Sequence, residues 1–283
     1  MPKFLYLLTA VLVLTQSIAY TDDCHAADTI RINGSGNALD MMKPLIGVYR
    51  KTHPDIRILM EKPLGSSGAV KALLADALDM AVVSRDLKPE ESAQGAALIK
   101  YGRTPLVIVT GKSVLKSGIS TKELEDIYIG KTSTWQNDEK IRLVQRTPED
   151  TDTNILRRLS PSMSSAITAS HARPGMIIAI TDPDSYNTIL KTPGSIGATA
   201  MNSIISEKLP LTMLSLNGIN PSLKSLSSGA YPLAKEISFV TTAKTPPATQ
   251  KFINFIFSTQ GRSIAEKAGV LVTAGVAEGN KVH

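Results

Sequence analysis

Residues 29–40 read TIRINGSGNALD, a run that predicts a strand, a glycine/serine turn and the start of a helix. Residues 29–33 alternate apolar and polar side chains as a strand does, and residues 38–53 carry apolar side chains at helical spacing. Between them lies the turn Gly34-Ser35-Gly36-Asn37, whose asparagine is placed to cap the helix. Such a turn leaves backbone N–H groups and a hydroxyl pointing at one spot beside the positive end of a helix. That arrangement suits a tetrahedral oxyanion.

Two further turns of the same kind follow in the first third of the chain. Gly65-Ser66-Ser67-Gly68 lies between the alternating run 55–61 and a helical pattern over 69–77, and Val83-Ser84-Arg85 ends the strand-like run 79–83. One glycine/serine turn indicates only a helix cap. Three of them, at equivalent positions of successive β/α units, predict donors that converge at one edge of a parallel sheet with right-handed crossovers.

The rest of the chain continues the α/β pattern. Apolar strands are expected over 103–110 (RTPLVIVT), 141–145 and 235–242 (KEISFVTT), a short helix over 121–128, and the strongest late helix within 246–268. No internal repeat or low-complexity linker interrupts them. The long middle is therefore interpreted as a second α/β lobe inserted between two segments of the first.

The N-terminus has the pattern of a secretory signal peptide. Lys3 precedes an apolar run over 4–14, and small and polar residues follow, so residues 1–27 are expected to be removed. The apolar run is too short and wrongly flanked for a membrane span, with a retained N-terminal anchor as the alternative. Later stretches are too polar to cross a bilayer, and the sequence predicts a soluble, periplasmic protein.

Charge and cysteine content narrow the function classes. The formal net charge is +6, but the basic residues are dispersed and only 5% of residues are aromatic, so nucleic-acid binding is not expected. Cys24 is the single cysteine, which leaves no intramolecular disulfide and no cysteine cluster for a metal. No cofactor is expected.

The turns, in their order and spacing, resemble the phosphate-binding proteins of high-affinity phosphate ABC importers. Later segments agree: LEDIYIG at 124–130 with Trp135, Arg146 before an acidic and hydroxyl-bearing turn, PGSIG at 193–197, and Tyr231-Pro232-Leu233. The resemblance runs from about Thr29 to Val272.

That resemblance implies a two-lobed α/β fold of the periplasmic-binding-protein class, type II, with the anion between the lobes. Each lobe is then a mainly parallel sheet flanked by helices, and two crossover strands form the hinge. Lobe I would comprise residues 28–105 plus 232–283, and lobe II residues 106–231, with RTPLVIVT and KEISFVTT as the crossovers.

The same resemblance implies which residues of lobe I hold the ligand. They are the members of the three turns: Ser35, Gly36, Asn37, Ala38, Ser66, Ser67, Gly68, Ser84 and Arg85. Some family members have an acid at the Arg85 position, which accepts a hydrogen bond from monoprotonated phosphate, whereas a guanidinium only donates. An inter-lobe salt bridge or a surface charge is the alternative role for Arg85.

On lobe II the resemblance implies Arg146 as a charged clamp, because a planar guanidinium engages two anion oxygens at once. The turn that follows reads TPEDTDT where the phosphate binders typically show Ser-Gly-Thr, and Thr151 and Thr153 are expected to supply hydroxyl donors. Asp150 and Asp152 would repel an anion unless they point away, by capping the helix from Asn154 or by pairing with Arg146, Arg157 or Arg158.

These features favour a binder over an enzyme. None of the four histidines has a motif partner, and no H-E-x-x-H, G-x-S-x-G or P-loop pattern is present. A hydrolase of phosphate esters that uses Asp150 or Asp152 is the enzymatic alternative.

The leading hypothesis is an exported, monomeric solute-binding protein without catalytic or metal-binding residues. It captures an oxyanion, inorganic phosphate first, and delivers it to an ABC permease in the inner membrane. Two alternatives keep the same fold: the protein binds another ligand, such as tungstate or molybdate, or it acts as the binding partner of a membrane sensor kinase.

Overall fold

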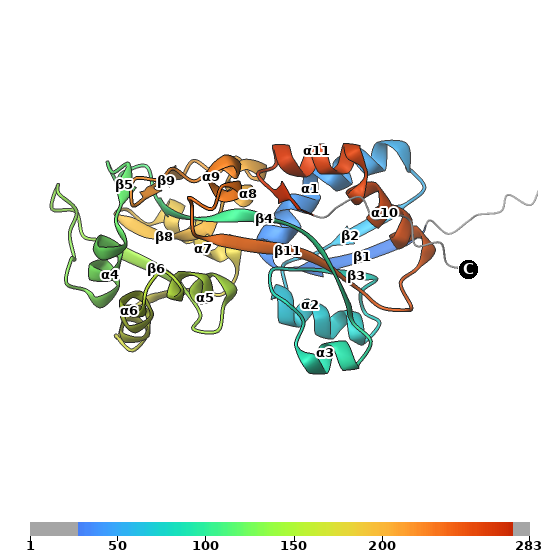
Figure 1. Cartoon of the computed structure of the whole chain (residues 1–283), viewed down its shortest axis with the longest axis horizontal. Helices are drawn as coiled ribbons and strands as arrows, with labels where there is room; N and C mark the ends of the chain where they lie inside the picture. Colours follow the sequence, from blue (N-terminus) through green and yellow to red (C-terminus); the bar gives the residue numbers. More distant parts are fainter. Residues whose placement is uncertain (1–27, 274–283) are drawn as a thin grey trace, which may run out of the picture.

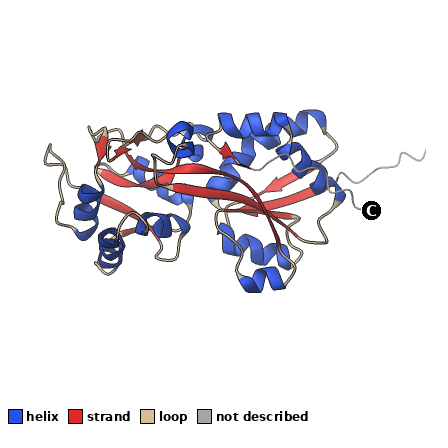
Figure 2. Ribbon diagram, in the orientation of Figure 1, coloured by secondary structure: helices blue, strands red, loops and turns tan. Residues whose placement is uncertain are grey.

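The computed structural model describes residues 28–273, which form two α/β halves joined by a pair of long strands (Figure 1, Figure 2). The signal peptide predicted for residues 1–27 lies outside the described residues. The first half alternates β1 (Thr29–Gly34), α1 (Gly36–Thr52), β2 (Arg57–Met60), α2 (Gly65–Leu74) and β3 (Met80–Val83), followed by α3 (Pro89–Ala93). β1 pairs in parallel with β2 and with β3, as the sequence pattern predicted.

The second half is built around another parallel unit. β6 lies between β7 and β8 and runs parallel to both. The elements of this half are β5 (Gly118–Ile119), α4 (Thr121–Ile129), β6 (Arg142–Arg146), α5 (Thr151–Arg157), α6 (Pro161–His171), β7 (Ile177–Ala179), α7 (Asp182–Lys191), β8 (Ser195–Ala200), α8 (Met201–Ser206), β9 (Thr212–Met213), β10 (Ser215–Leu216) and α9 (Leu223–Ser227).

Two antiparallel strands, β4 (Ala97–Thr110) and β11 (Ala234–Thr241), connect the halves. The first part of β4 pairs with β11 and with β12 (Leu271–Val272), and its last part pairs with β8 and β9. The strands therefore form one continuous order, β2-β1-β3-β11-β4-β8-β6-β7. The sequence identified both strands but placed the start of β4 at Arg103, six residues too late, because residues 97–102 are only partly apolar.

Separate apolar cores lie on either side of this pair of strands. One core packs α1 and α10 (Pro247–Phe257) against β1 and includes Met42 and Phe252. The other packs α4 and α6 against β4, β6 and β8 and includes Ile167 and Ile196. We call the half with the first core lobe I and the half with the second core lobe II. Their exact boundary remains a prediction.

The late helix expected within 246–268 is confirmed as α10, and a second helix, α11 (Thr259–Lys267), follows it. Ser258 adopts an extended backbone between them, and its hydroxyl caps α11 by accepting a hydrogen bond from the Gly261 amide. The turn Gly65–Gly68 does not precede α2 but forms its first turn.

Within residues 28–273, none of the helices combines the length and the apolar character that a bilayer span requires.

Candidate functional site

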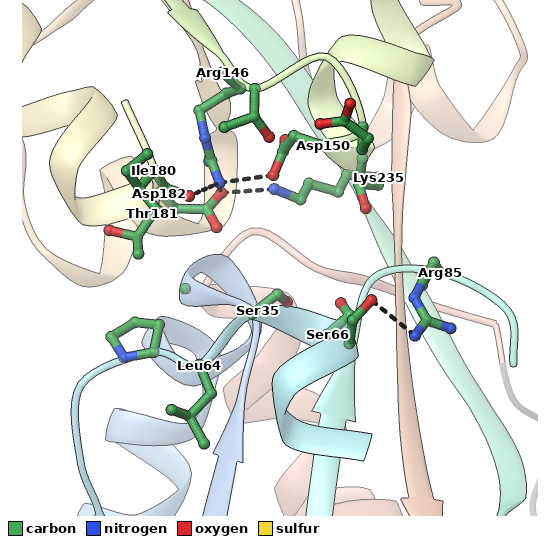
Figure 3. A pocket seen from close by; sticks show the side chains of 17 residues that line it. Ser35, Leu64, Ser66, Arg85, Arg146, Asp150, Ile180, Thr181, Asp182 and Lys235 are labelled. Atoms are coloured by element: carbon green, nitrogen blue, oxygen red, sulfur yellow. Dashed lines mark hydrogen bonds and ion pairs between the residues drawn. The ribbon is translucent and has the colours of Figure 1, made fainter. Parts of the chain in front are cut away.

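A cavity of about 270 Å³ lies between the lobes (Figure 3). Lobe I lines it with Ser35, Gly36, residues 63–67 and Arg85. From the other side come Lys235 of β11 and the lobe II residues Arg146, Thr147, Glu149, Asp150, Thr151, Ile180, Thr181 and Asp182. In both lobes the lining residues follow the carboxyl ends of parallel strands, the position at which open α/β sheets bind ligands.

The first turn of lobe I is held rigid by its own polar side chains. The Ser35 hydroxyl lies 3.0 Å from Asn37 Oδ1 and 2.8 Å from the Ser84 hydroxyl, which in turn donates to Asn37 Oδ1 at 3.0 Å. Asn37 and Ser84 are therefore buried supports that fix Ser35 at the cavity edge.

The N-terminus of α2 offers donors to the cavity. The backbone N–H groups of its first turn, which include those of Ser66 and Ser67, have no acceptor within the helix. The Ser66 hydroxyl oxygen accepts a hydrogen bond from the Ser84 amide at 3.0 Å, so its own proton remains available to donate. Together with the positive end of the helix, these groups form a site suited to an anion.

Arg85 forms a salt bridge inside lobe I. Its two terminal nitrogens lie 2.6 and 2.8 Å from the carboxylate of Glu91 in α3, and Nη2 also donates to the Ser67 hydroxyl at 3.0 Å. Hydrogen bonding from Arg85 holds the pKa of Glu91 below its usual range. The pairing is intra-lobe rather than the inter-lobe bridge considered from the sequence.

Arg146, the last residue of β6, reaches the cavity from lobe II. Nη2 donates to Asp150 Oδ2 at 2.7 Å and to the Ile180 carbonyl at 3.0 Å, while Nη1 lies 3.5 Å from Asp182 and 3.6 Å from Asp152. The side chain is only 7% exposed, yet Nε and Nη1 have no hydrogen-bond partner among the described residues. Both nitrogens are buried, and Nη1 faces the carboxylates of Asp152 and Asp182, so the guanidinium shares its charge with three aspartates at the cavity wall.

Lys235 is a second buried cation that sequence reasoning missed. It is 1% exposed, and its Nζ lies 2.6 Å from both Asp152 Oδ1 and Asp182 Oδ1. Although burial opposes the charged form, the two aspartates raise the pKa of Lys235 above its usual range. No local signal marks it, because the strand KEISFVTT also contains Glu236, Ser238 and two threonines.

The pKa values of the two aspartates are shifted in opposite directions. Burial raises the pKa of Asp152 to about 6, despite the opposing effect of Lys235. Burial also pushes the pKa of Asp182 upward, but Lys235 and Arg146 outweigh it and hold that pKa below its usual range. Both carboxylates lie in the first turns of helices, α5 and α7 respectively, where the positive helix end stabilises a negative charge.

Asp182 of lobe II also contacts lobe I at the start of α1. It receives a hydrogen bond from the backbone N–H of Asn37 at the start of α1. The approach is close, because a Cβ on Gly36 would lie 2.7 Å from the Asp182 Cβ. Beside it, Asn202 of α8 donates to the Asn37 carbonyl at 2.7 Å. A carboxylate of lobe II thus occupies the N-terminus of α1, which the sequence had assigned to the ligand.

The structure brings together seven of the residues that the resemblance implied as ligands and leaves the others outside the cavity lining. Those that line it are Ser35, Gly36, Ser66, Ser67, Arg85, Arg146 and Thr151. Those that do not are Asn37, Ala38, Gly68, Ser84 and Thr153. Asn37, Ala38 and Ser84 are buried behind the first turn, and the Thr153 hydroxyl donates to the Thr147 carbonyl instead.

In the acidic turn, Asp150 and Asp152 pair with cations of the protein, and Asp150 also caps a helix, which reduces their repulsion of an anion. The Asp150 carboxylate pairs with Arg146 and caps α5 by accepting from the Asp152 amide at 2.8 Å. Asp152 turns inward to Lys235. Arg157, one of the alternative partners, instead donates to Ser164 and Thr168 of α6.

Comparison with known proteins assigns the chain to a family. A family model described as "PBP superfamily domain" matches residues 21–260. The chain belongs to the PBP superfamily.

Individual relatives support the same assignment over most of the chain. The phosphate-binding protein PstS of Borreliella burgdorferi is 26% identical over 92% of this chain and 96% of its own. The PstS of Bacillus subtilis is 24% identical over 82% of this chain and 76% of its own. Among solved structures, a putative phosphate ABC transporter substrate-binding protein from Clostridium perfringens, with bound phosphate, gives a TM-score of 0.75 at 18% identity. That structure covers 87% of this chain and 100% of its own, and it shows that the two-lobed periplasmic-binding-protein fold expected from the sequence is correct.

Proposed function

We propose that this protein is an exported solute-binding protein that captures an oxyanion, inorganic phosphate first, between its lobes and delivers it to an ABC permease. The observation that carries the proposal is the pairing of donors across the cavity. The N-terminus of α2 with Ser66 and Ser67 lies on one side, and the guanidinium of Arg146 lies on the other. The names of the relatives and the phosphate in the related structure favour phosphate over other oxyanions.

Capture of the ligand follows from the division of the hydrogen-bond donors between the two lobes. An oxyanion that contacts only one lobe leaves the donors of the other lobe unused, so ligand binding favours the conformation in which both sets are close. The strands β4 and β11, which continue from one lobe into the other, are the hinge in this mechanism. The protein acts as a periplasmic monomer, with the lobe boundaries near residues 105 and 232.

Membership of a binding-protein superfamily favours this role over hydrolysis of phosphate esters. In addition, Asp150 and Asp152 already engage Arg146 and Lys235. Absence of turnover with a generic phosphomonoester would agree with a binder.

The test is calorimetric titration of the exported protein, stripped of anion by partial unfolding and refolding, with phosphate, sulfate, molybdate and tungstate. Phosphate is expected to bind most tightly. Ser66→Ala and Arg146→Ala are each expected to weaken binding by roughly tenfold to a hundredfold, because each removes a hydrogen bond to a charged ligand. Ser165→Ala, on α6, removes a hydroxyl that donates to the Pro161 carbonyl and should change nothing. Failure of all four anions to bind would overturn the proposal.

A further inference from the structure

The turn that follows β3 bonds to both serine hydroxyls at the start of α2. The Ser84 amide donates to the Ser66 hydroxyl oxygen at 3.0 Å, and Nη2 of Arg85 donates to the Ser67 hydroxyl oxygen at 3.0 Å. Figure 3 shows the bond from Arg85 to the first turn of α2 as a dashed line. Two consecutive residues thus bond to two consecutive hydroxyls, both of which belong to residues that line the cavity.

These bonds restrict where the hydroxyl protons can point. A serine hydroxyl has one proton to donate and lone pairs that accept. The bond from Arg85 occupies a lone pair of Ser67, and within the described residues it is the one hydrogen bond of that hydroxyl. The Ser67 proton is therefore left to donate to a group in the cavity, and the same holds for Ser66.

The guanidinium of Arg85 has no terminal N–H left for a ligand. Nη1 donates to the Asp86 carbonyl and to Glu91 Oε2, both at 2.8 Å. Nη2 donates to Glu91 Oε1 at 2.6 Å and to the Ser67 hydroxyl. These bonds use the four terminal N–H groups, and the fifth N–H, on Nε, is buried. Arg85 therefore lines the cavity without a free fork of donors for an anion.

Glu91 holds the guanidinium in this orientation. Its carboxylate contacts both terminal nitrogens of Arg85, and Oε2 also accepts from the Lys88 amide at 2.8 Å, which anchors it at the start of α3. A bidentate pair of arginine and carboxylate has a defined plane, so Glu91 determines where Nη2 meets Ser67. Glu91 is not among the described residues that line the cavity. Because the two charges of the pair cancel, the pair adds no net charge to the site.

We infer that Arg85 and Glu91 form a positioning pair, which directs the Ser67 hydroxyl proton toward the bound oxyanion and does not itself bind the ion. This inference rests on the proposed function, because it needs an oxyanion at the N-terminus of α2. It deepens that function by separating the residues that touch the ion from those that orient them. Arg85, which the family resemblance placed among the ligands, acts through Ser67 instead.

The test is a double-variant cycle with phosphate, measured by calorimetry on the exported protein. Arg85→Met/Glu91→Gln removes the pair without changing the net charge and should weaken phosphate binding by about threefold to tenfold, the effect of one hydrogen bond. Ser67→Ala alone should weaken it by roughly tenfold. In the Ser67→Ala background, removal of the pair should cause no further loss, because no hydroxyl remains to be oriented.

Lys244→Met/Asp76→Asn is the matched control. It removes another ion pair of lobe I, again without a change in net charge, and neither residue lines the cavity. Phosphate affinity should stay within twofold. Thermal unfolding of each variant checks that the protein remains folded.

The outcomes separate the two proposals. Equal weakening by removal of the pair in both backgrounds overturns the positioning role, because Arg85 then contacts the ion directly or the pair supports the lobe in general. Unchanged or tighter phosphate binding after removal of the pair also overturns it. Both results leave the oxyanion binder intact. If sulfate, molybdate or tungstate binds more tightly than phosphate, the cycle uses that anion and the same outcomes apply. If none of the four anions binds, both proposals fail.

Discussion

The two sides of the cavity achieve polarity by different means. Lobe I presents mainly neutral donors, the hydroxyls and helix N–H groups around Ser35 and Ser66, which hydrogen bonds to Ser84 hold in place, while its Arg85 is paired with Glu91. Lobe II, with Lys235 of β11, presents full charges that largely neutralise one another: two cations, Arg146 and Lys235, among the carboxylates of Asp150, Asp152 and Asp182. The comparison teaches that the lobe I side offers hydrogen-bond donors for an anion, whereas the lobe II side is a charge network in which Arg146 already faces three carboxylates.

The largest expected effect comes from breaking the charged side. Lys235→Met keeps the side-chain volume but leaves Asp152 and Asp182 buried without their shared cation. The free energy of unfolding should fall by about 3–5 kcal/mol, as for other buried pairs that lose one partner. Urea denaturation followed by circular dichroism measures it.

A control and a rescue accompany this variant. Lys244→Ala removes an exposed pair with Asp76 and should cost less than about 1 kcal/mol. Adding Asp152→Asn to Lys235→Met should restore part of the loss. If Lys235→Met and Lys244→Ala lower the free energy of unfolding equally, the stability of the buried charge network does not depend on Lys235.

An intermediate loss of stability is expected where α1 of lobe I contacts Asp182 of lobe II. Gly36→Ala places a Cβ 2.7 Å from Asp182 Cβ and Pro183 Cδ, so the N-terminus of α1 must move away from lobe II. Stability should fall by about 1–3 kcal/mol, the usual cost of overpacking, and phosphate affinity should fall with it. Thermal unfolding and calorimetry report the two quantities.

Gly47→Ala in the same helix is the matched control. Nothing lies within 4 Å of a Cβ at Gly47, so alanine should stabilise α1 by about 0.5–1 kcal/mol. A Gly36→Ala protein as stable as the Gly47→Ala protein would mean that the lobes do not meet at Gly36 as described.

The smallest expected effect is a pH dependence of the free energy of unfolding. It arises from buried carboxylates and so tests the charged side of the cavity. The pKa of Asp152 is about 6 in the folded protein, above the ~3.9 of an unfolded chain. Between these values the folded state holds a proton that the unfolded state has released, so stability from this group is present at low pH and is lost as pH rises through about 6.

Asp152→Asn should flatten this part of the stability profile, measured by urea denaturation between about pH 4 and pH 7. Asp40, whose pKa burial also raises to about 6, contributes in the same direction. The double variant Asp40→Asn/Asp152→Asn should therefore be flatter than either single variant. An unchanged slope in all three would contradict the assignment of the pH dependence to buried aspartates.

The sequence by itself determined the parallel units of lobe I and the turns that carry its donors. Strand alternation, helical spacing and glycine/serine turns are properties of neighbouring residues, so β1, α1, β2 and β3 could be predicted within a few residues. Arg146 was singled out through the family resemblance, and the structure places it at the end of β6 beside the polar turn.

Only the tertiary structure decided what surrounds Arg146. Lys235 comes from a strand almost ninety residues away in sequence, and Asp182 comes from a helix cap that resembles any other. Neither carries a local signal, because their role depends on which strand ends meet in the folded sheet. Local patterns thus specify where donors are, while long-range packing decides which charges neutralise them and how much room the ligand has.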